Sequence, residues 1–300
     1  MIKIERLLIF FGILSLIILS SCDLKQGDPE PSPQFYDLYV TERDQYPSWS
    51  PDGSQIAYSH LSGVFPEPTD YPSGLYVIDK DGTNRQIIRE GSFNNPTWSP
   101  DGLSITFMSG GRLVSINLNS LDERILSSDV DSYYYPDYNP DGSHLLFDRL
   151  NNENGSLLVT NILFDSTPEV FNDSFINVRD VEFSTDGNQL VYMKGSVEYS
   201  SLEIAKYDLL NNVETRLTLD NIDDRYPTWS PDNLKIAWSR NVQITIMDQD
   251  GTNQRQVAYG TYPSWSVSNQ IVYSGANDNI TKEVLYVIDP DGKNKRQITF

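Results

Sequence analysis

Hydrophobic positions along this chain come in short runs, each ended by a turn sequence a few residues later. In residues 46–60, YPSWSPDGSQIAYSH, a strand ends on an aromatic residue, a Pro-Asp-Gly turn follows, and a second apolar strand begins. Close variants of this stretch occupy residues 95–109 and 226–240. Short apolar runs bounded by Pro, Asp and Gly predict β-strands that are joined by hairpin turns.

The same unit occurs six times when the chain is aligned on the aromatic residue before the turn. The steps between successive copies run from 36 to 49 residues, a period that is typical of propeller blades. These anchor aromatics are Trp49, Trp98, Tyr138, Phe183, Trp229 and Trp265. A second aromatic follows in the next strand of each copy, at Tyr58, Phe107, Phe147, Tyr192, Trp238 and Tyr273.

The turns and later strands of the unit complete a four-stranded blade. Pro favours the first central position of a type I turn, and Gly takes the left-handed conformation that follows; Asn233 replaces Gly in the fifth copy, because Asn also adopts that conformation. Each unit then adds a C strand ending on Asp or Asn, and a D strand. The sequence therefore predicts an all-β fold, a six-bladed β-propeller of four-stranded antiparallel blades over residues 35–300.

The first residues read as a targeting segment. Lys3 and Arg6 precede an apolar run over residues 7–19, which is too short to span a bilayer and fits the core of a signal peptide. The sequence LSSC, ending at Cys22, resembles the lipobox of bacterial lipoproteins, in which the cysteine is lipidated and the chain is cut before it. We therefore expect a signal peptide over residues 1–21 and a lipidated, flexible tether over residues 22–34. The alternatives are a cleaved signal with an incidental cysteine or an uncleaved short anchor.

The repeated wording P-x-W-S-P-D-G, I-A-Y and L-Y-V-I-D-x-D-G-x-N-x-R-Q-I-T resembles the WD-repeat-like propeller unit of the TolB family. The resemblance covers residues 45–300, closely in copies one, two, five and six and loosely in copies three and four. It implies a TolB-type propeller. Only residues 23–44 precede the first blade, so we expect the α/β domain that TolB carries ahead of its propeller to be missing here.

Composition narrows the chemistry. The net charge of −20 disfavours nucleic acid as a partner and leaves acylation as the means of membrane attachment. Two histidines, His60 and His144, are expected at the surface on opposite faces, too few for a zinc site. No G-x-S-x-G nucleophile motif occurs. The D-x-D-G-x-N turns that begin at Asp79, Asp248 and Asp289 resemble the start of a calcium loop but offer too few ligands. We therefore predict no metal, no cofactor and no catalytic residue.

The candidate binding surface lies where the connections between blades reach the channel. Propeller strand order places these D–A connections on one face with the B–C loops, and function on scaffolds tends to occupy such variable loops. We predict a partner-binding site that comprises Tyr46, Phe65, Tyr71, Asn95, Tyr135, Tyr226 and Tyr262. Phe65 and Tyr71 belong to the long B–C loop of the first copy and are expected to lean over the channel mouth. The alternative is that the aligned residues only pack the start of each blade.

These patterns favour a monomeric, membrane-tethered, non-catalytic propeller that binds an envelope protein or peptide in the bacterial cell envelope, at the inner or the outer membrane. The alternatives are a glycan lyase or hydrolase that uses carboxylates in the channel mouth, and a carbohydrate-binding propeller without chemistry. Whether residues 35–41 add a strand that closes the ring is left open by the sequence.

Overall fold

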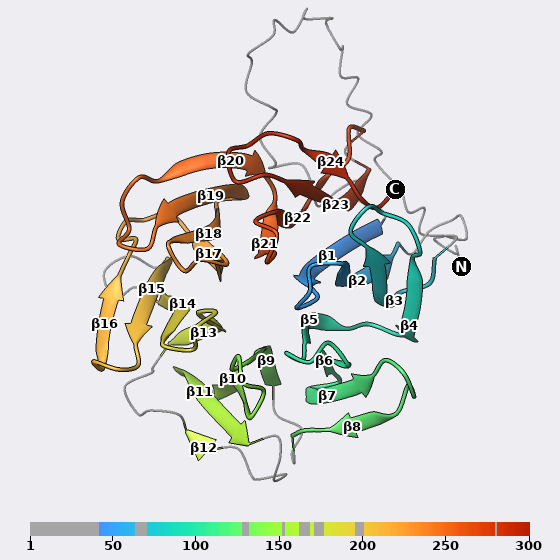
Figure 1. Ribbon diagram of the computed structural model, residues 1–300, viewed down its shortest axis with the longest axis horizontal. Coiled ribbons are helices and arrows are strands. Elements are labelled where there is room, and N and C mark those ends of the chain that lie inside the picture. The colour runs from blue at the N-terminus through green and yellow to red at the C-terminus, as the bar shows by residue number, and fades with distance from the viewer. Residues whose placement is uncertain are drawn as a thin grey trace, which may run out of the picture. The chain divides into compact units, whose positions relative to one another are not determined.

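The computed structural model describes residues 42–63, 71–127, 132–151, 154–161, 169–170, 177–195, 201–279 and 281–300. Its strands form six antiparallel four-stranded blades around a common centre (Figure 1), which confirms the all-β propeller predicted from the repeats. None of the described segments forms a helix with the length and apolar character that crossing a bilayer requires.

Each blade contributes four strands in order from the centre outward. The innermost A strands are β1 (Glu42–Trp49), β5 (Asn94–Trp98), β9 (Ser132–Tyr138), β13 (Val178–Phe183), β17 (Asp224–Trp229) and β21 (Thr261–Trp265). The B strands are β2 (Gln55–Ser62), β6 (Ser104–Ser109), β10 (His144–Asn151), β14 (Gln189–Gly195), β18 (Lys235–Arg240) and β22 (Ile271–Ala276). The C strands are β3 (Gly74–Asp79), β7 (Arg112–Asn117), β11 (Asn154–Asn161), β15 (Leu202–Asp208), β19 (Gln243–Asp248) and β23 (Lys282–Ile288). The outer D strands are β4 (Gln86–Glu90), β8 (Glu123–Ile125), β12 (Glu169–Val170), β16 (Val213–Arg216), β20 (Arg255–Tyr259) and β24 (Arg296–Gln297).

The A–B hairpins have the geometry that the repeat predicts. Every A strand ends on its anchor aromatic, and in blade one Trp49 pairs with Ile56, seven residues later. The Asp52 carboxylate of that turn accepts hydrogen bonds from the Ser50 hydroxyl (2.7 Å) and the Ser54 amide (3.0 Å). Gly53 and, in blade five, Asn233 have φ of 68° and 59°. The left-handed position is therefore occupied by the two residue types that adopt it at least cost.

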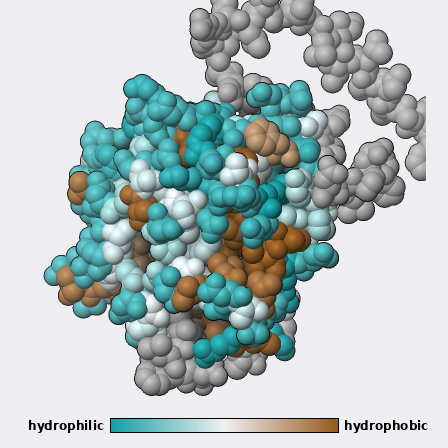
Figure 2. All heavy atoms as spheres, turned by 45° about the vertical axis from the view of Figure 1, so that its right-hand side comes forward, coloured by the Kyte–Doolittle hydropathy of each residue, from teal (hydrophilic) through white to brown (hydrophobic). Residues whose placement is uncertain are grey.

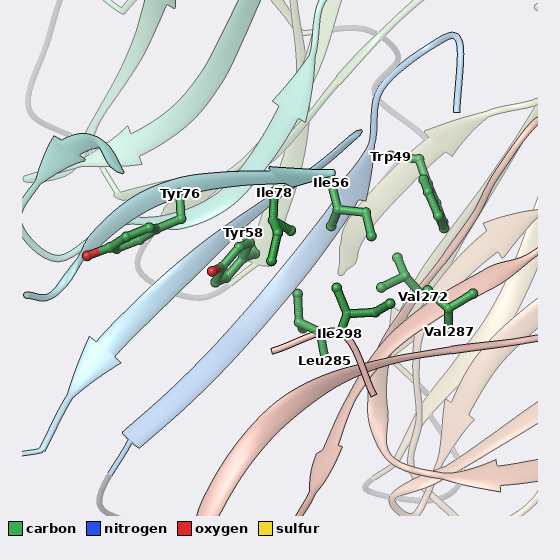
Figure 3. Packing of buried hydrophobic residues seen from close by; sticks show 9 residues of the cluster. All are labelled: Trp49, Ile56, Tyr58, Tyr76, Ile78, Val272, Leu285, Val287 and Ile298. Atoms are coloured by element: carbon green, nitrogen blue, oxygen red, sulfur yellow. The ribbon is translucent and has the colours of Figure 1, made fainter. Parts of the chain in front are cut away.

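The core lies between the faces of neighbouring blades. On the B strand of blade one, Ile56, Ala57 and Tyr58 are fully buried, because a propeller blade is covered on both faces. Figure 3 shows the seam between blades one and six, where Trp49, Ile56, Tyr58, Tyr76, Ile78, Val272, Leu285, Val287 and Ile298 pack together. Indole N–H groups also link neighbouring blades. Trp49 Nε1 donates to the Ser264 carbonyl between blades one and six, and Trp98 Nε1 donates to the Ser48 carbonyl between blades two and one, both at 3.1 Å.

The first and last blades share one continuous sheet. The start of β1 pairs in parallel with β23, with Glu42 opposite Lys282 and Arg43 opposite Glu283. Lys282 Nζ and Glu42 Oε2 form an ion pair at 2.9 Å across this junction. The chain thus closes its ring by backbone pairing between segments at opposite ends of the propeller, while residues 35–41 lie outside the described residues.

The outer surface is mainly polar. Figure 2 shows a face on which hydrophilic side chains predominate and hydrophobic ones gather in small groups. Large hydrophobic side chains that are more than half exposed occur on several blades, among them Leu121, Leu210, Leu219 and Phe300. Single exposed side chains of this kind are ordinary on a soluble surface and do not by themselves mark a binding site.

Candidate functional site

One ring of residues, one from each blade, begins the central channel at its D–A end. All six have positive φ, between 50° and 57°: Tyr46, Asn95, Tyr135, Asp180, Tyr226 and Tyr262. The pairing register between the A and B strands shifts at this point, for example between Gln45 and Ser48 in blade one. Such bulges redirect side chains at barrel rims and next to functional sites. The left-handed conformation is unfavourable for tyrosine, so its fourfold recurrence indicates that the fold holds these rings in place.

Four of the six ring residues form a contiguous aromatic arc. The ring centroids of Tyr46 and Tyr262 are 4.2 Å apart, those of Tyr226 and Tyr262 are 4.3 Å apart, and those of Tyr135 and Tyr226 are 6.2 Å apart. The Tyr262 hydroxyl also reaches the Tyr46 hydroxyl at 3.4 Å. Asn95 and Asp180 are the two ring members that are not aromatic. The mouth of the channel is therefore bordered by four tyrosine rings and by two polar side chains, those of Asn95 and Asp180.

A second ring lies deeper, two residues further along each A strand. It consists of Ser48, Thr97, Asp137, Glu182, Thr228 and Ser264. Five of these residues, all except Thr228, line a cavity of about 110 Å³ together with the first ring. The same five also line an adjoining hollow of about 210 Å³ among the anchor aromatics, so that the second ring separates the two parts of the channel.

Blades three and four replace the hydroxyl of the second ring with a carboxyl. Asp137 Oδ2 accepts the Phe183 amide of the next blade at 2.8 Å. Glu182 Oε1 accepts the Trp229 amide at 2.7 Å and the Thr228 hydroxyl at 3.1 Å. The two carboxyls therefore connect neighbouring blades as well as facing the channel. A carboxylate has about four lone-pair sites, so each keeps acceptor capacity for a ligand.

Burial and mutual repulsion raise the pKa of these channel carboxyls. Burial raises the pKa of Asp137 to about 7, although the Phe183 and Tyr138 amides oppose the shift. Burial together with the charge of Asp137 raises the pKa of Asp180 to about 8. The pKa of Glu182 is raised well above its usual value, first by burial and then by Asp137. Carboxyls with raised pKa values in a cleft are a recognised mark of functional sites.

Two further acceptors lie unpaired beside these carboxyls. Asn95 is 9% exposed and lines the cavity, and its Oδ1 has no hydrogen-bond partner within the described structure. Asp148 on β10 is 1% exposed, and both of its oxygens likewise lack a partner among the described residues. The pKa of Asp148 is raised by burial and then by the charge of Asp180, so the two carboxyls act on each other. A buried acceptor without a donor is costly, and it indicates a group that a ligand would satisfy.

Tyr71, in the long B–C loop of blade one, belongs to a separate cluster of aromatic and charged side chains. Tyr71 packs over the Arg85 guanidinium, with 3.8 Å from Cζ to the ring centroid. Arg85 Nη2 lies 3.2 Å from His60 Nδ1, which binds Asp44 Oδ1 at 2.7 Å. His60 is only 2% exposed, so the expectation that it lies at the surface is wrong. The ring is buried because the Asp44 carboxylate gives it a hydrogen-bond partner inside the protein. His144 is exposed, as expected.

The structure brings together five of the seven predicted binding residues. Tyr46, Asn95, Tyr135, Tyr226 and Tyr262 line one cavity. Tyr71 is not among the residues lining it, since it lies against Arg85 of the C–D connection, and Phe65 and Cys22 lie outside the described residues. The expectation that Tyr71 leans over the channel mouth is therefore not met.

The D-x-D-G-x-N turns use their own polar groups. In the first of them, Asn84 Nδ2 donates to Asp79 Oδ2 at 2.7 Å, and the Asp81 carboxylate accepts the Thr83 hydroxyl at 2.6 Å. The turns at Asp248 and Asp289 repeat the Asn–Asp bond, both at 2.6 Å. The carboxylates are thus engaged in turn geometry. Within the described residues, no group of three or more His, Cys, Asp or Glu side chains is placed to hold a metal ion.

Sequence reasoning missed the acidic side of the channel. The Y-P-x-W columns of the repeats hold the signal: blade four reads D-V-E-F where the others begin with Tyr or Asn, and blade three reads Y-P-D-Y. Asp180, Asp137 and Glu182 occupy these substituted columns. Copies three and four match the repeat only loosely, and the substitutions that weaken the match are those that place carboxyls in the channel.

Comparison with known families agrees with the channel-bearing propeller. A family model described as the TolB beta propeller domain matches residues 65–300. The chain belongs to this family. Among related sequences of the family, the Tol-Pal system protein TolB of Francisella tularensis is 31% identical over 272 residues, which cover 79% of this chain and 60% of that protein. The crystal structure of TolB from Acinetobacter baumannii superposes with a TM-score of 0.68 at 20% identity, covering 81% of this chain and 63% of that one.

Enzymes also share this propeller fold or sequence. A Bacillus subtilis protein named as the uncharacterized peptidase YuxL is 24% identical over 208 residues, which cover 66% of this chain but 30% of that protein. An oligogalacturonate lyase from Vibrio parahaemolyticus superposes with a TM-score of 0.57 at 12% identity, covering 88% of this chain and 79% of that one, and this likeness concerns the fold alone. The chain thus spans 60% of the Francisella TolB and 30% of the Bacillus protein, less than two thirds of each.

Proposed function

We propose that this protein is a membrane-tethered, non-catalytic scaffold of the bacterial cell envelope that docks a protein or peptide at the D–A mouth of its channel. The observation that carries the proposal is the aromatic arc of Tyr46, Tyr135, Tyr226 and Tyr262 bordering one cavity. Tyrosine offers a large contact area with little loss of conformational entropy. The relation to a protein of the Tol-Pal system supports an envelope protein as the partner.

The docking proposal is tested by capture from envelope extracts with the full-length protein in detergent. Tyr262→Ala should reduce specific recovery of the captured protein by at least tenfold, about 1.4 kcal/mol. Tyr259→Ala is the matched control, because Tyr259 lies on the outer strand β20 and does not line the channel. Equal recovery with both variants would contradict docking at this mouth.

Lipid attachment at Cys22 carries the tethering part of the proposal. The apolar run of residues 7–19 and the lipobox-like LSSC support it. Cys22→Ala should remain an uncleaved precursor without attached lipid, as judged by mass spectrometry and metabolic labelling with a fatty acid. Normal processing and continued membrane retention of this variant would refute the lipobox assignment.

The B–C loop of blade one is proposed as an accessory contact. Ser62 and Ser73 bracket the loop through a 2.9 Å bond from the Ser62 amide to the Ser73 hydroxyl, so residues 63–72 can be replaced by a short Gly-containing turn without removing a strand. We expect an intact fold and at least tenfold weaker partner binding. Unchanged affinity would restrict the docking site to the channel mouth.

The second candidate function is acid–base chemistry on a glycan. It is favoured by one observation, the channel carboxyls Asp137 and Asp180 with pKa values raised to about 7 and about 8. Such values suit a general acid near neutral pH. Incubation with envelope and plant polysaccharides, followed by product analysis, separates the candidates. Products that disappear in Asp137→Asn and Asp180→Asn would establish an enzyme, whereas glycan affinity without products would indicate a binding module.

A further inference from the structure

The channel beside blades three and four concentrates hydrogen-bond acceptors and negative charge without a matching donor. No cation acts on the pKa of Asp137, Asp180 or Glu182, whose shifts arise from burial, from one another and from hydrogen bonds. Asn95, which is more than nine-tenths buried, lines the same cavity, and its Oδ1 has no hydrogen-bond partner among the described residues. Every unmet group at this site therefore requires a hydrogen-bond donor, and the carboxylates require a positive charge.

We propose that the channel receives a positively charged side chain of the docked partner, a guanidinium or an ammonium group, between the tyrosine arc and the carboxyls of blades three and four. This inference rests on the docking function proposed above and names the chemistry of the partner residue that enters. A guanidinium presents five N–H donors and no acceptor, which matches the carboxyl oxygens of blades three and four and the unpaired Oδ1 of Asn95.

The aromatic arc favours an organic cation over a bare metal ion. Guanidinium and ammonium groups bind the faces of aromatic rings within about 6 Å, and Tyr135 and Tyr226 border the cavity on both sides of Asp180. Arg85 already makes such a contact with Tyr71 elsewhere in this protein. A metal ion would instead need three or more closely placed ligands, and the described part of the chain holds no such group.

Neighbouring blades show why the acids belong to a ligand site. In blade five the protein itself supplies a base for the buried carboxyl, since Arg240 pairs with Asp224 at 3.0 Å. Burying a carboxylate without such a base costs several kcal/mol, so a partner that brings the missing charge is bound by relieving that cost. The net charge of −20 adds long-range attraction for the same kind of partner.

Binding of this kind depends on pH. A carboxylate attracts the cation and a protonated carboxyl does not, so affinity for a guanidinium rises as the pH passes upward through the range in which Asp137 and Asp180 ionise, about 7 to about 8. Asp137 and Asp180 act on Glu182, and Asp180 also acts on Tyr46, Tyr135 and Asp148, which is in addition subject to the charge of Arg179. Of these only Arg179 is positive; it is exposed, and it acts on Asp148.

The test uses isothermal titration of the full-length protein in detergent with two short Gly–Ser peptides, acetylated and amidated, that carry a central arginine or its neutral isostere citrulline. At pH 8.5 and low ionic strength, the arginine peptide should bind at least tenfold more tightly than the citrulline peptide. The preference should fall to less than threefold at pH 5.5. Equal binding of the two peptides at pH 8.5 would overturn the proposal, and so would stoichiometric binding of Ca²⁺ alone that displaces the arginine peptide.

Amide substitutions test the residues without removing their structural hydrogen bonds. Asp180→Asn keeps a residue suited to φ of 51°, and Glu182→Gln retains the oxygen that accepts the Trp229 amide. The double variant should lose the preference for arginine. If it does not fold, Asp180→Asn alone should reduce the preference at least threefold, and a full preference in either folded variant would refute the assignment.

Asn95→Asp provides a gain-of-function control, since it adds an acceptor charge at the same ring and should tighten arginine binding. No gain would contradict the placement of the cation beside Asn95.

Envelope capture separates this inference from the docking proposal. If Tyr262→Ala abolishes capture of the envelope protein while the two peptides bind equally, the docking proposal stands and the cationic partner residue is refuted. If the arginine peptide is preferred but Tyr262→Ala captures the envelope protein normally, the cation site stands and the docking proposal is refuted.

Discussion

Near the channel end of their A strands, blade four holds a half-buried carboxyl, Asp180, and blade five a fully buried one, Asp224, in opposite surroundings. Asp224 in blade five accepts Trp238 Nε1 at 2.7 Å and pairs with Arg240 Nη1 at 3.0 Å. Asp180 in blade four has neither a donor nor a cation acting on it among the described residues. Burial raises both pKa values, to about 6 for Asp224 and about 8 for Asp180. The pKa of Asp224 is held lower by hydrogen bonds from Trp238 and Thr218 and then by Arg240, whereas the charge of Asp137 raises the pKa of Asp180 further.

The comparison separates stability from binding. Blade one repeats the arrangement of blade five, with His60 and Arg85 beside Asp44 at the position aligned with Asp224. In these blades the ionic group is complete without a ligand and holds the A strand to the B strand. In blades three and four the carboxyls face the channel and remain incomplete, which is typical of a site that an external group completes.

Breaking the pair in blade five should have the largest effect. Arg240→Met leaves Asp224 buried without its cation, and we expect the free energy of unfolding to fall by about 3 kcal/mol at pH 7.5, measured by urea denaturation. The loss should be smaller at pH 5, where Asp224 is protonated in the folded protein. A loss below about 1 kcal/mol at pH 7.5 would mean that Asp224 is no better compensated than Asp180, and the comparison would fail.

Neutralising the acid in blade four should have the opposite sign. The pKa of Asp180 is near 3.9 in the unfolded chain and about 8 in the folded protein, so the unfolded chain binds fewer protons between these values and the free energy of unfolding falls as pH rises. Asp180→Asn removes this penalty. We expect a gain of about 1–2 kcal/mol at pH 8.5, limited by water in the channel, and no gain at pH 4.

Urea melts of the wild type and Asp180→Asn at pH 4, 6 and 8.5 measure this difference. A residual slope should remain in the variant, because Asp137 and Glu182 also have raised pKa values. Destabilisation of Asp180→Asn at every pH would show that the Asp180 carboxylate has a structural partner.

Removing a hydrogen bond that Asp224 accepts makes its surroundings more like those of Asp180. Trp238→Phe deletes the indole N–H while keeping an aromatic ring in a fully buried position. We expect a loss of about 1–2 kcal/mol from the lost hydrogen bond and the smaller ring. The same variant should raise the pKa of Asp224, seen by NMR titration of its carboxyl carbon. An unchanged pKa would show that the Trp238 hydrogen bond does not affect the ionisation of Asp224.

An exposed ion pair gives the smallest expected effect. Lys293 Nζ lies 2.9 Å from Asp291 Oδ2, and both side chains are more than half exposed. Lys293→Ala should change the free energy of unfolding by less than about 0.5 kcal/mol. A larger change would mean that an exposed ion pair contributes to the free energy of unfolding as much as a buried one. The contrast between blades four and five, which rests on burial, would then be weaker.

The fold was predictable from the sequence because the determinants of a blade are local and repeat. The anchor aromatics, the Pro-Asp-Gly turns and the Asp or Asn at the C-strand ends occur where the structure has strand ends, and even the pairing of Trp49 with Ile56 follows from the seven-residue spacing. The five aligned ring residues could be placed together for the same reason, since equivalent positions of blades arranged around one axis face the same channel.

The properties of the site depend on contacts between residues far apart in the chain. The repeat columns place Asp224 and Asp180, but they do not show that Asp224 pairs with Arg240 across neighbouring strands or that Asp180 interacts with Asp137 and Asp148 of the preceding blade. Nor could the sequence show that His60 is buried against Asp44 or that Tyr71 packs on Arg85 away from the channel. Hydrophobic periodicity and turn chemistry therefore determined the propeller by themselves. Only the tertiary structure decided which carboxyls have a counter-charge, because electrostatic pairing depends on distance in space and on exclusion of water.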